Sequence, residues 1–362
     1  MDTINFEKII SVENLLLAWK EFTRGKRNKK DVQEFQLHFM DNVLSLHQDL
    51  KNKKYVHGGY YAFNISDPKP RNIHKANVRD RLLHHAIYRI LYPYFDSKFI
   101  HDSYSCRLEK GTHKAINRFR DMFFKVSKNN TRSCFVLKCD IRKFFANINH
   151  NILKTILEKY IKDKNILWLP SQVIDSFNSI YAIADIKKHQ YSNSAIARHE
   201  YHGLPLGNLT SQLLVNIYMN EFDQFVKREL KVKYYIRYAD DFVVLSQNKE
   251  YLKTILEKME EFLENKLKLH IHPDKVYIRT ITSGVDFLGW VNFFKHRVLR
   301  TSTKRRMFKN VKNNPKLETV QSYLGMLRHG NAYKLAKIVS YLGNEKKLLE
   351  KIGPGDNYGR GG

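Results

Sequence analysis

The sequence has no long apolar run, no leader-like start and few cysteines. No stretch of about 18 apolar residues, the length that spans a bilayer, occurs in its 362 residues. The N-terminus lacks the basic and apolar segments of a secretory signal. The three cysteines, Cys106, Cys134 and Cys139, lack zinc-like spacing, so we expect reduced core residues. These absences argue against membrane, secreted and zinc-binding classes and favour a folded cytoplasmic protein.

Acidic residues are scarce relative to basic ones. The chain has 63 Lys and Arg against 36 Asp and Glu, which gives a net charge of +27. Such an excess predicts a polyanionic partner, because each phosphate that is neutralised releases counterions. A structural nucleic-acid binder would carry the same charge. The charge therefore indicates nucleic acid without separating an enzyme from a binding protein.

Two of the few acids stand together between β-prone runs. Residues 234–246 read YYIRYADDFVVLS, which predicts a hairpin with Asp240 and Asp241 at its turn. Carboxylates held rigidly between hydrophobic strands suit a hard divalent cation such as Mg²⁺. An ordinary Asp-rich turn is the alternative, because Asp is a favoured turn residue.

A third carboxylate follows another apolar strand. Residues 134–149 read CFVLKCDIRKFFANIN, in which strand residues 135–137 lead to Asp140 and an aromatic pair follows. Three carboxylates from two strands can hold two Mg²⁺ ions roughly 4 Å apart, the arrangement for in-line phosphoryl displacement. The third acid therefore favours a two-metal site over an ordinary turn.

Four segments in this order resemble the motifs of reverse transcriptases. Asp140–Phe145 and Tyr238–Asp241 are similar to the metal-binding motifs. GLPLGNLTSQLLVNIY at 203–218 is similar to the loop and helix that cradle the incoming nucleotide and the template, and FLGW at 287–290 to the primer-holding turn. The resemblance covers roughly residues 55–330. It implies an α+β right-hand polymerase fold with fingers, palm and helical thumb, and RNA-directed DNA polymerase activity with two Mg²⁺ ions.

The resemblance also implies individual site residues. The catalytic and metal-binding residues would be Asp140, Asp240 and Asp241, with Ile141 as a further metal contact. The residues implied at the incoming dNTP are Lys69, Arg71, Arg79, Phe144, Phe145, Leu206, Gly207, Gln212 and Lys275. The residues implied at primer and template are Arg107, Tyr238, Phe287, Leu288, Gly289 and Trp290.

Some of these roles have a physical reason and an ordinary alternative. Phe145 would sit under the sugar and exclude a 2′-hydroxyl, whereas Phe144 suits core packing equally. Arginine pairs phosphate oxygens with its planar fork, but Arg79 has the alternative of a structural ion pair with Asp80. Lys275 would protonate pyrophosphate, or is simply a surface lysine.

The nucleotide loop departs from the pattern of many reverse transcriptases. They commonly place Gln before the first glycine and Pro after the serine, where this chain has Leu206 and Gln212. That variant resembles the enzymes of diversity-generating retroelements, which copy a template RNA and misincorporate opposite its adenines. Loss of an amide near the nascent pair removes a polar contact that discriminates between bases. The resemblance implies mutagenic retrohoming with a small basic accessory protein oligomer as partner.

The expected elements divide the chain into four parts. These are an N-terminal helical extension at 1–54, fingers and palm at 55–295 with an insertion at 163–202, a helical thumb at 296–350 and a flexible Gly-rich tail at 351–362. The patterns predict helices over 11–22, from Asp31 to Leu50, over 79–91, 151–162 and 249–267, and from Arg297 onward. The short segment after residue 290 suggests no nuclease domain and fits a compact bacterial or phage enzyme in the cytoplasm.

Three other functions remain open from the sequence. A retron, group II-like or phage-defence reverse transcriptase would share the motifs. A non-catalytic RNA-binding protein on a palm scaffold would share the charge, although it has no need for three clustered acids. An RNA-dependent RNA polymerase is opposed mainly by Phe145.

Overall fold

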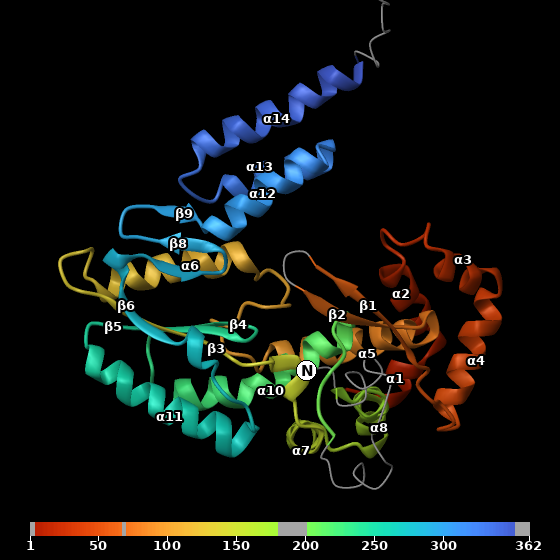
Figure 1. Ribbon diagram of the computed structural model, residues 1–362. Coiled ribbons are helices and arrows are strands. Elements are labelled where there is room, and N and C mark those ends of the chain that lie inside the picture. Colours follow the sequence, from red (N-terminus) through yellow and green to blue (C-terminus); the bar gives the residue numbers. More distant parts are fainter. Residues whose placement is uncertain (1–3, 67–69, 180–200, 352–362) are drawn as a thin grey trace, which may run out of the picture. The chain divides into compact units, whose positions relative to one another are not determined.

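The computed structural model describes residues 4–66, 70–179 and 201–351, and the chain forms two compact units (Figure 1). The first unit consists of Met1–Gly111, Lys138–Val244 and Lys253–Val276. The second unit consists of Thr112–Leu137, Leu245–Leu252 and Tyr277–Gly362. The N-terminal helices thus share a unit with the fingers hairpin and most of the palm segments. The four-part division by sequence stays a prediction.

Helices make up the N-terminal part of the first unit. They are α1 (Phe6–Ile10), α2 (Val12–Phe22), α3 (Lys30–Leu37), α4 (Phe39–Lys51) and α5 (Val78–Asp96). Helix α2 begins after Ser11, whose hydroxyl accepts a hydrogen bond from the Asn14 amide as an N-cap. The Asn14 side chain donates to the carbonyl of Ala86 at 3.1 Å, which fastens α2 to α5.

The single helix expected from Asp31 to Leu50 is wrong, because the helix is interrupted at His38, which separates α3 from α4. His38 has φ −116° and ψ 42°, outside the helical region. The break lets Phe35 and Phe39 both pack against Trp19, with ring centroids 5.1 and 5.0 Å away. The Asn42 side chain donates to the Phe35 carbonyl that the break leaves open. Tertiary packing on one tryptophan therefore overrides the helical periodicity.

A two-stranded hairpin and a four-stranded sheet supply the strands of the fingers and palm (Figure 1). The hairpin pairs β1 (Tyr60–Ile65) with β2 (Arg71–Ala76) in antiparallel register. The sheet has the order β4-β5-β3-β6, and its strands are β3 (Phe135–Asp140), β4 (Tyr235–Tyr238), β5 (Asp241–Ser246) and β6 (Tyr277–Thr280). Strands β3 and β5 each pass from one unit into the other.

The remaining elements of the first unit surround these strands. They are η1 (Phe144–Asn147), α7 (His150–Tyr160), α8 (Lys164–Asp175), α10 (Leu209–Gln224), the π-helical turn η3 (Phe225–Glu229) and η4 (Pro273–Lys275). Helix α11 (Lys249–Leu267) runs through both units, over the range expected. Helix α10 packs on α5 and α7, and its Phe222 ring contacts Phe242 of β5 at 5.2 Å. The predicted α+β composition is confirmed by these helices and antiparallel strands.

The second unit combines a helix, a three-stranded sheet and a helical end. Its elements are α6 (Thr112–Val126), η5 (Ile281–Ser283), β7 (Val285–Phe287), β8 (Trp290–Asn292), β9 (Arg297–Leu299), α12 (Thr301–Asn313), α13 (Leu317–Leu327) and α14 (Tyr333–Lys351). The expectation of a helix from Arg297 onward is wrong at its start, because Arg297 lies in β9 opposite Asn292. The Arg297 side chain donates to the Asn117 side chain and the His329 carbonyl.

The structure also bears on membrane-spanning helices and on the positions of the three cysteines. Among the described residues, no helix combines the length and apolarity needed to cross a bilayer. Cys134 and Cys139 are buried free thiols, and burial raises the pKa of Cys134 to about 12. Cys106 is exposed, so a core position was wrong for that cysteine.

Candidate active site

The YADD segment forms a tight β-hairpin. Tyr238 pairs with Asp241, so Ala239 and Asp240 are the two residues of the turn. Ala239 has φ 56°, in the left-handed region that two-residue hairpin turns require. Asp240 therefore stands at the tip, and Asp241 is the first residue of β5. The strands fold this way because Tyr235, Ile236, Val243 and Val244 are buried on both sides of the turn.

Asp140 lies beside this turn at the end of β3. Strand β3 neighbours β5 in the sheet, and the Ile141 amide donates to the carbonyl of Asp240 at 3.1 Å. The Asp140 carbonyl in turn accepts a hydrogen bond from the His272 amide at 2.8 Å. The structure thus brings together the three carboxylates and Ile141 from segments about 100 residues apart.

The three carboxylates interact electrostatically. Burial, together with the carboxylates of Asp140 and Asp241, raises the pKa of Asp240 to about 6, while Lys275 opposes the shift. Burial disfavours the ionised carboxyl, and like charges close by disfavour it too, so the shift reflects both desolvation and neighbouring negative charge at the hairpin tip. A cation bound there would relieve it.

Two lysines contact the outer members of this acidic group. Lys275 Nζ lies 2.8 Å from Asp140 Oδ1, and Lys138 Nζ lies 3.1 Å from Asp241 Oδ1. The Lys138 side chain is only 10% exposed, whereas that of Lys275 is 43% exposed. Lys138 alternates with Asp140 along β3, which places both on one face of the strand.

The donor set fits divalent metal ions by its chemistry. Mg²⁺ takes carboxylate oxygens, and Asp140, Asp240 and Asp241 supply them next to one another. Over the described residues, however, no three His, Cys, Asp or Glu side chains converge closely enough to hold a metal. A metal would have to replace lysine Nζ on Asp140 and Asp241.

Predicted nucleotide-binding segments converge next to η1. The Leu204 amide donates to the Phe145 carbonyl at 2.8 Å, and the His74 amide of β2 donates to the Leu206 carbonyl at 3.0 Å. The Asn208 side chain donates to the His74 carbonyl at 2.9 Å. The loop before α10 therefore bridges η1 and the fingers hairpin, which also carries the exposed Arg71.

Gly207 is required by the geometry of this loop. Its φ is 107°, and a Cβ there would lie 2.8 Å from the Ile73 Cγ2 atom of β2. Any side chain would push the loop away from the fingers hairpin. Leu206 and Gln212 beside it are half-buried. Their roles toward a nucleotide stay predictions.

Other predicted dNTP residues are engaged elsewhere. Arg79 pairs with Asp49 of α4 at 2.5 Å, so its ion pair is structural but does not involve the expected partner, Asp80. Asp80 instead accepts a hydrogen bond from the Tyr55 hydroxyl at 2.6 Å. Phe144 is buried, as core packing requires. Lys69 lies outside the described residues.

Arg107, predicted at primer and template, pairs within the chain. Its side chain is 6% exposed and donates to the Asp96 carboxylate at 2.6 Å. It also donates to the carbonyls of Ile100 and Ser103 at 2.7 and 3.0 Å. The donors of this guanidinium thus serve the loop after α5, and a contact of Arg107 with primer or template stays a prediction.

The predicted primer-holding turn lies in the second unit. Leu288 and Gly289 form the turn between β7 and β8, with φ 53° and 88°. Phe287 and Trp290 flank it and are buried, and Phe287 packs on Phe119 with ring centroids 5.4 Å apart. Their side chains thus support the turn from inside the unit. In the first unit, Tyr238 is half-buried beside the Ala239–Asp240 turn.

The sequence reasoning missed three charged residues near the hairpin. They are Lys138 on β3, Arg237 on β4 and Asp223 on α10, all buried. The available signal was a charge inside an otherwise apolar strand or helix face, which is costly unless a partner is present.

Comparison with known proteins identifies the family. Residues 65–291 match the family described as "Reverse transcriptase (RNA-dependent DNA polymerase)". Protein YkfC of Escherichia coli is 27% identical over 271 residues, 66% of each chain. The group II intron-encoded protein LtrA of Lactococcus lactis is 24% identical over 308 residues, which cover 68% of this chain and 47% of LtrA.

A solved telomerase structure from Candida tropicalis aligns with this chain at 15% identity and a TM-score of 0.44. The alignment covers 73% of this chain and 59% of the telomerase chain. That likeness is too weak to carry weight. The chain spans about two thirds of YkfC and about half of LtrA. The family match covers most of the chain and confirms the right-hand polymerase fold. The chain belongs to the reverse transcriptase family.

Proposed function

We propose that this protein is an RNA-directed DNA polymerase that copies a template RNA into cDNA. The observation that carries the proposal is the meeting of Asp140 with the Asp240–Asp241 hairpin, where burial and the neighbouring carboxylates raise the pKa of Asp240. A binder of polyanions gains nothing from concentrating negative charge beside its ligand. A polymerase needs that charge, because phosphoryl transfer depends on placed cations.

Asp140, Asp240 and Asp241 would hold two Mg²⁺ ions, with Ile141 beside them. When bound, these ions supply Lewis-acid stabilisation of the attacking and leaving oxygens. The new bond would join the primer 3′-oxygen to the α-phosphorus as the 3′-hydroxyl proton leaves to solvent, and the bond from the α-phosphorus to the pyrophosphate oxygen would break. Lys275, which is next to Asp140, would donate a proton to the leaving pyrophosphate.

The loop before α10 would select the nucleotide. Phe145 and Leu206 lie on backbone segments that are hydrogen-bonded into one framework with β2. We assign Phe145 to exclusion of the 2′-hydroxyl, and Arg71 with Lys69 to the triphosphate. The substrates are therefore dNTPs, and the nucleic-acid partners are the template RNA and the RNA–cDNA duplex.

The finer assignment is the error-prone enzyme of a diversity-generating retroelement. It rests on Leu206 and Gln212, which replace the Gln and Pro common in other reverse transcriptases. An aliphatic side chain in place of an amide offers no hydrogen bond to the base pair, so discrimination weakens. A small basic accessory protein oligomer and a cytoplasmic location belong to this assignment.

The alternative is a retron, phage-defence or group II-like enzyme. The similarity to LtrA, described as a group II intron-encoded protein, favours the group II-like form. Errors at template adenines distinguish the two, because only the diversity-generating assignment expects them.

Primer extension on an RNA template containing all four bases, with Mg²⁺ and dNTPs, tests the function. We expect cDNA whose errors concentrate opposite adenine, and no product from the Asp240→Asn variant. Evenly low errors would retain the polymerase and refute the diversity-generating assignment. RNA binding without product, even with candidate RNA and accessory partners present, would favour the scaffold alternative.

A further inference from the structure

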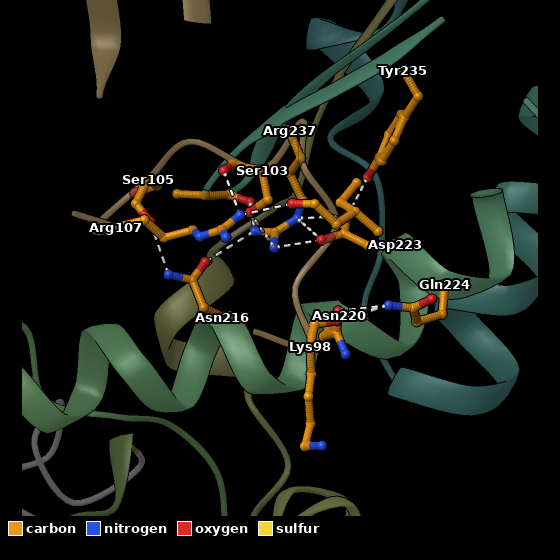
Figure 2. A network of polar contacts seen from close by, with 12 residues as sticks. Lys98, Ser103, Ser105, Arg107, Asn216, Asn220, Asp223, Gln224, Tyr235 and Arg237 are labelled. Atoms are coloured by element: carbon orange, nitrogen blue, oxygen red, sulfur yellow. Dashed lines mark hydrogen bonds and ion pairs between the residues drawn. The ribbon is translucent and has the colours of Figure 1, made fainter. Parts of the chain in front are cut away.

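A fully buried ion pair, Arg237 with Asp223, is shown in Figure 2, and its arginine is hydrogen-bonded to the Ala239–Asp240 turn. Arg237 of β4 and Asp223 of α10 have side chains that are 0% exposed, with Nη2 and Oδ2 2.7 Å apart. Burying two charges costs hydration, and apolar replacements of such pairs are often equally stable. Fold stability alone is therefore a weak explanation for charges at this position.

The Arg237 guanidinium uses all five of its N–H donors. Nε and Nη2 donate to the Asp223 carboxylate at 2.8 and 2.7 Å, and Nη2 also donates to Ser103 Oγ at 3.1 Å. Nη1 donates to Asn216 Oδ1 at 3.4 Å and to the backbone carbonyl of Ala239 at 3.1 Å. Because the donors lie in one rigid plane, these acceptors together determine the orientation of the group.

The contact with Ala239 connects this network to the catalytic turn. Ala239 has φ 56°, a left-handed conformation that is unfavourable for a residue with a Cβ. Its carbonyl belongs to the peptide that leads into Asp240. The hydrogen bond from Arg237 holds that peptide plane in place.

Neighbouring segments keep Arg237 itself in place (Figure 2). The Arg237 amide donates to the Asp102 carbonyl, and the Tyr104 amide donates to the Arg237 carbonyl, both at 3.0 Å. The Tyr235 hydroxyl donates to Asp223 Oδ1 at 2.7 Å. Strand β4 is thus tied by its backbone to residues 102–104 and by its side chains to α10.

We propose that the Arg237–Asp223 pair is a positioning element that holds Ala239 of the Ala239–Asp240 turn in its left-handed conformation and so orients the catalytic carboxylates. The pair is fully buried and touches no substrate, so Arg237 is a positioning residue. This role rests on the proposed polymerase function. Its structural part, order at the turn, is measurable without catalysis.

The test compares Arg237→Lys with the wild type. Lysine keeps the charge opposite Asp223, but its single nitrogen cannot also reach Ala239, Asn216 and Ser103. We expect kcat to fall tenfold or more while the dNTP KM stays within twofold. Amide hydrogen exchange of residues 238–242 should accelerate at least tenfold, and Mn²⁺ affinity should fall severalfold.

Arg89→Lys is the matched control. Arg89 of α5 pairs with Glu21 and Asn14 of α2, so the substitution also shortens the reach of a paired arginine in the first unit. We expect its kcat and its exchange at residues 238–242 to match the wild type. Equal losses in both variants would show a general stability effect and overturn the proposal.

Unchanged exchange and kcat in folded Arg237→Lys would also overturn it. If that variant does not fold, Arg237→Met combined with Asp223→Leu removes both charges and keeps a packed core. Faster exchange at the turn in this folded double variant supports positioning, whereas wild-type exchange overturns it. A wild type that makes no product refutes the polymerase function instead, and the exchange comparison still decides the positioning role.

Discussion

Two groups of charged residues meet at the β4–β5 hairpin, and their environments are opposite. At the hairpin tip, Asp240 lies among like charges, and Lys138 and Lys275 contact the neighbouring carboxylates. In the second group, Arg237 and Asp223 are sealed from solvent, and every guanidinium donor has an acceptor. The first group is left electrostatically unbalanced, and the second is fully satisfied. The difference indicates that a buried network with all its hydrogen bonds satisfied supports a site whose carboxylates are suited to bind a cation.

The largest expected effect is a loss of polymerase activity when Asp240 of the acidic group is replaced. Asp240→Asn should lower primer extension on the order of 10³-fold, the scale for loss of a group that stabilises transition-state charge. The fold should persist, because the variant removes a buried charge. Single-turnover primer extension and a thermal melt on the same preparation check both parts. Retained activity would remove Asp240 from the catalytic group.

Breaking the buried pair should also lower the stability of the fold. Asp223→Asn leaves the Arg237 guanidinium without its counter-charge, which costs about 3–5 kcal/mol of unfolding free energy. Urea unfolding measures the loss. Asp175→Asn, at a half-exposed carboxylate paired with Lys154, is the control and should change the free energy by about 1 kcal/mol or less. Similar losses of unfolding free energy in both variants would contradict the expected difference between the buried pair and the half-exposed pair.

The raised pKa of Asp240 predicts a pH dependence of stability. Its folded value of about 6 lies above the ordinary 3.8, so folding favours the protonated carboxyl. That stabilisation is present below pH 4 and is lost as pH rises through 6. In EDTA, Asp240→Asn should therefore melt higher than the wild type at pH 7.5, with a difference that shrinks as pH falls toward 4. A difference that does not change with pH would contradict the assignment.

The smallest expected effect concerns Lys138. Because this lysine contacts Asp241, it competes with a metal for the carboxylate. Lys138→Met should raise Mn²⁺ affinity by about threefold to tenfold, since a nearby positive charge is removed. Titration followed by electron paramagnetic resonance measures this, with Lys138→Arg as the charge-preserving control. Weaker binding in the Met variant would show that Lys138 positions Asp241 instead.

Secondary-structure elements were predictable where a single local sequence pattern dominated. The alternation around YADD, the N-cap Ser11 and the apolar periodicity of 249–267 each yielded the element that forms. The break at His38 was not predictable, because both halves have a helical pattern and only Trp19 packing separates them. The pairing of Arg107 with Asp96 was not predictable, because a basic residue in a loop has the same sequence signature whether it faces phosphate or a carboxylate of the chain.

The sequence by itself determined the acids, their order and the strands that carry them, because β-prone runs and turn residues act locally. It also determined the family, through motifs in a consistent order. Only the tertiary structure decided which charges meet: Asp140 with Asp240, Arg237 with Asp223, and Arg79 with Asp49. Those pairings depend on burial and on contacts between distant segments, since electrostatic interactions strengthen where water is excluded.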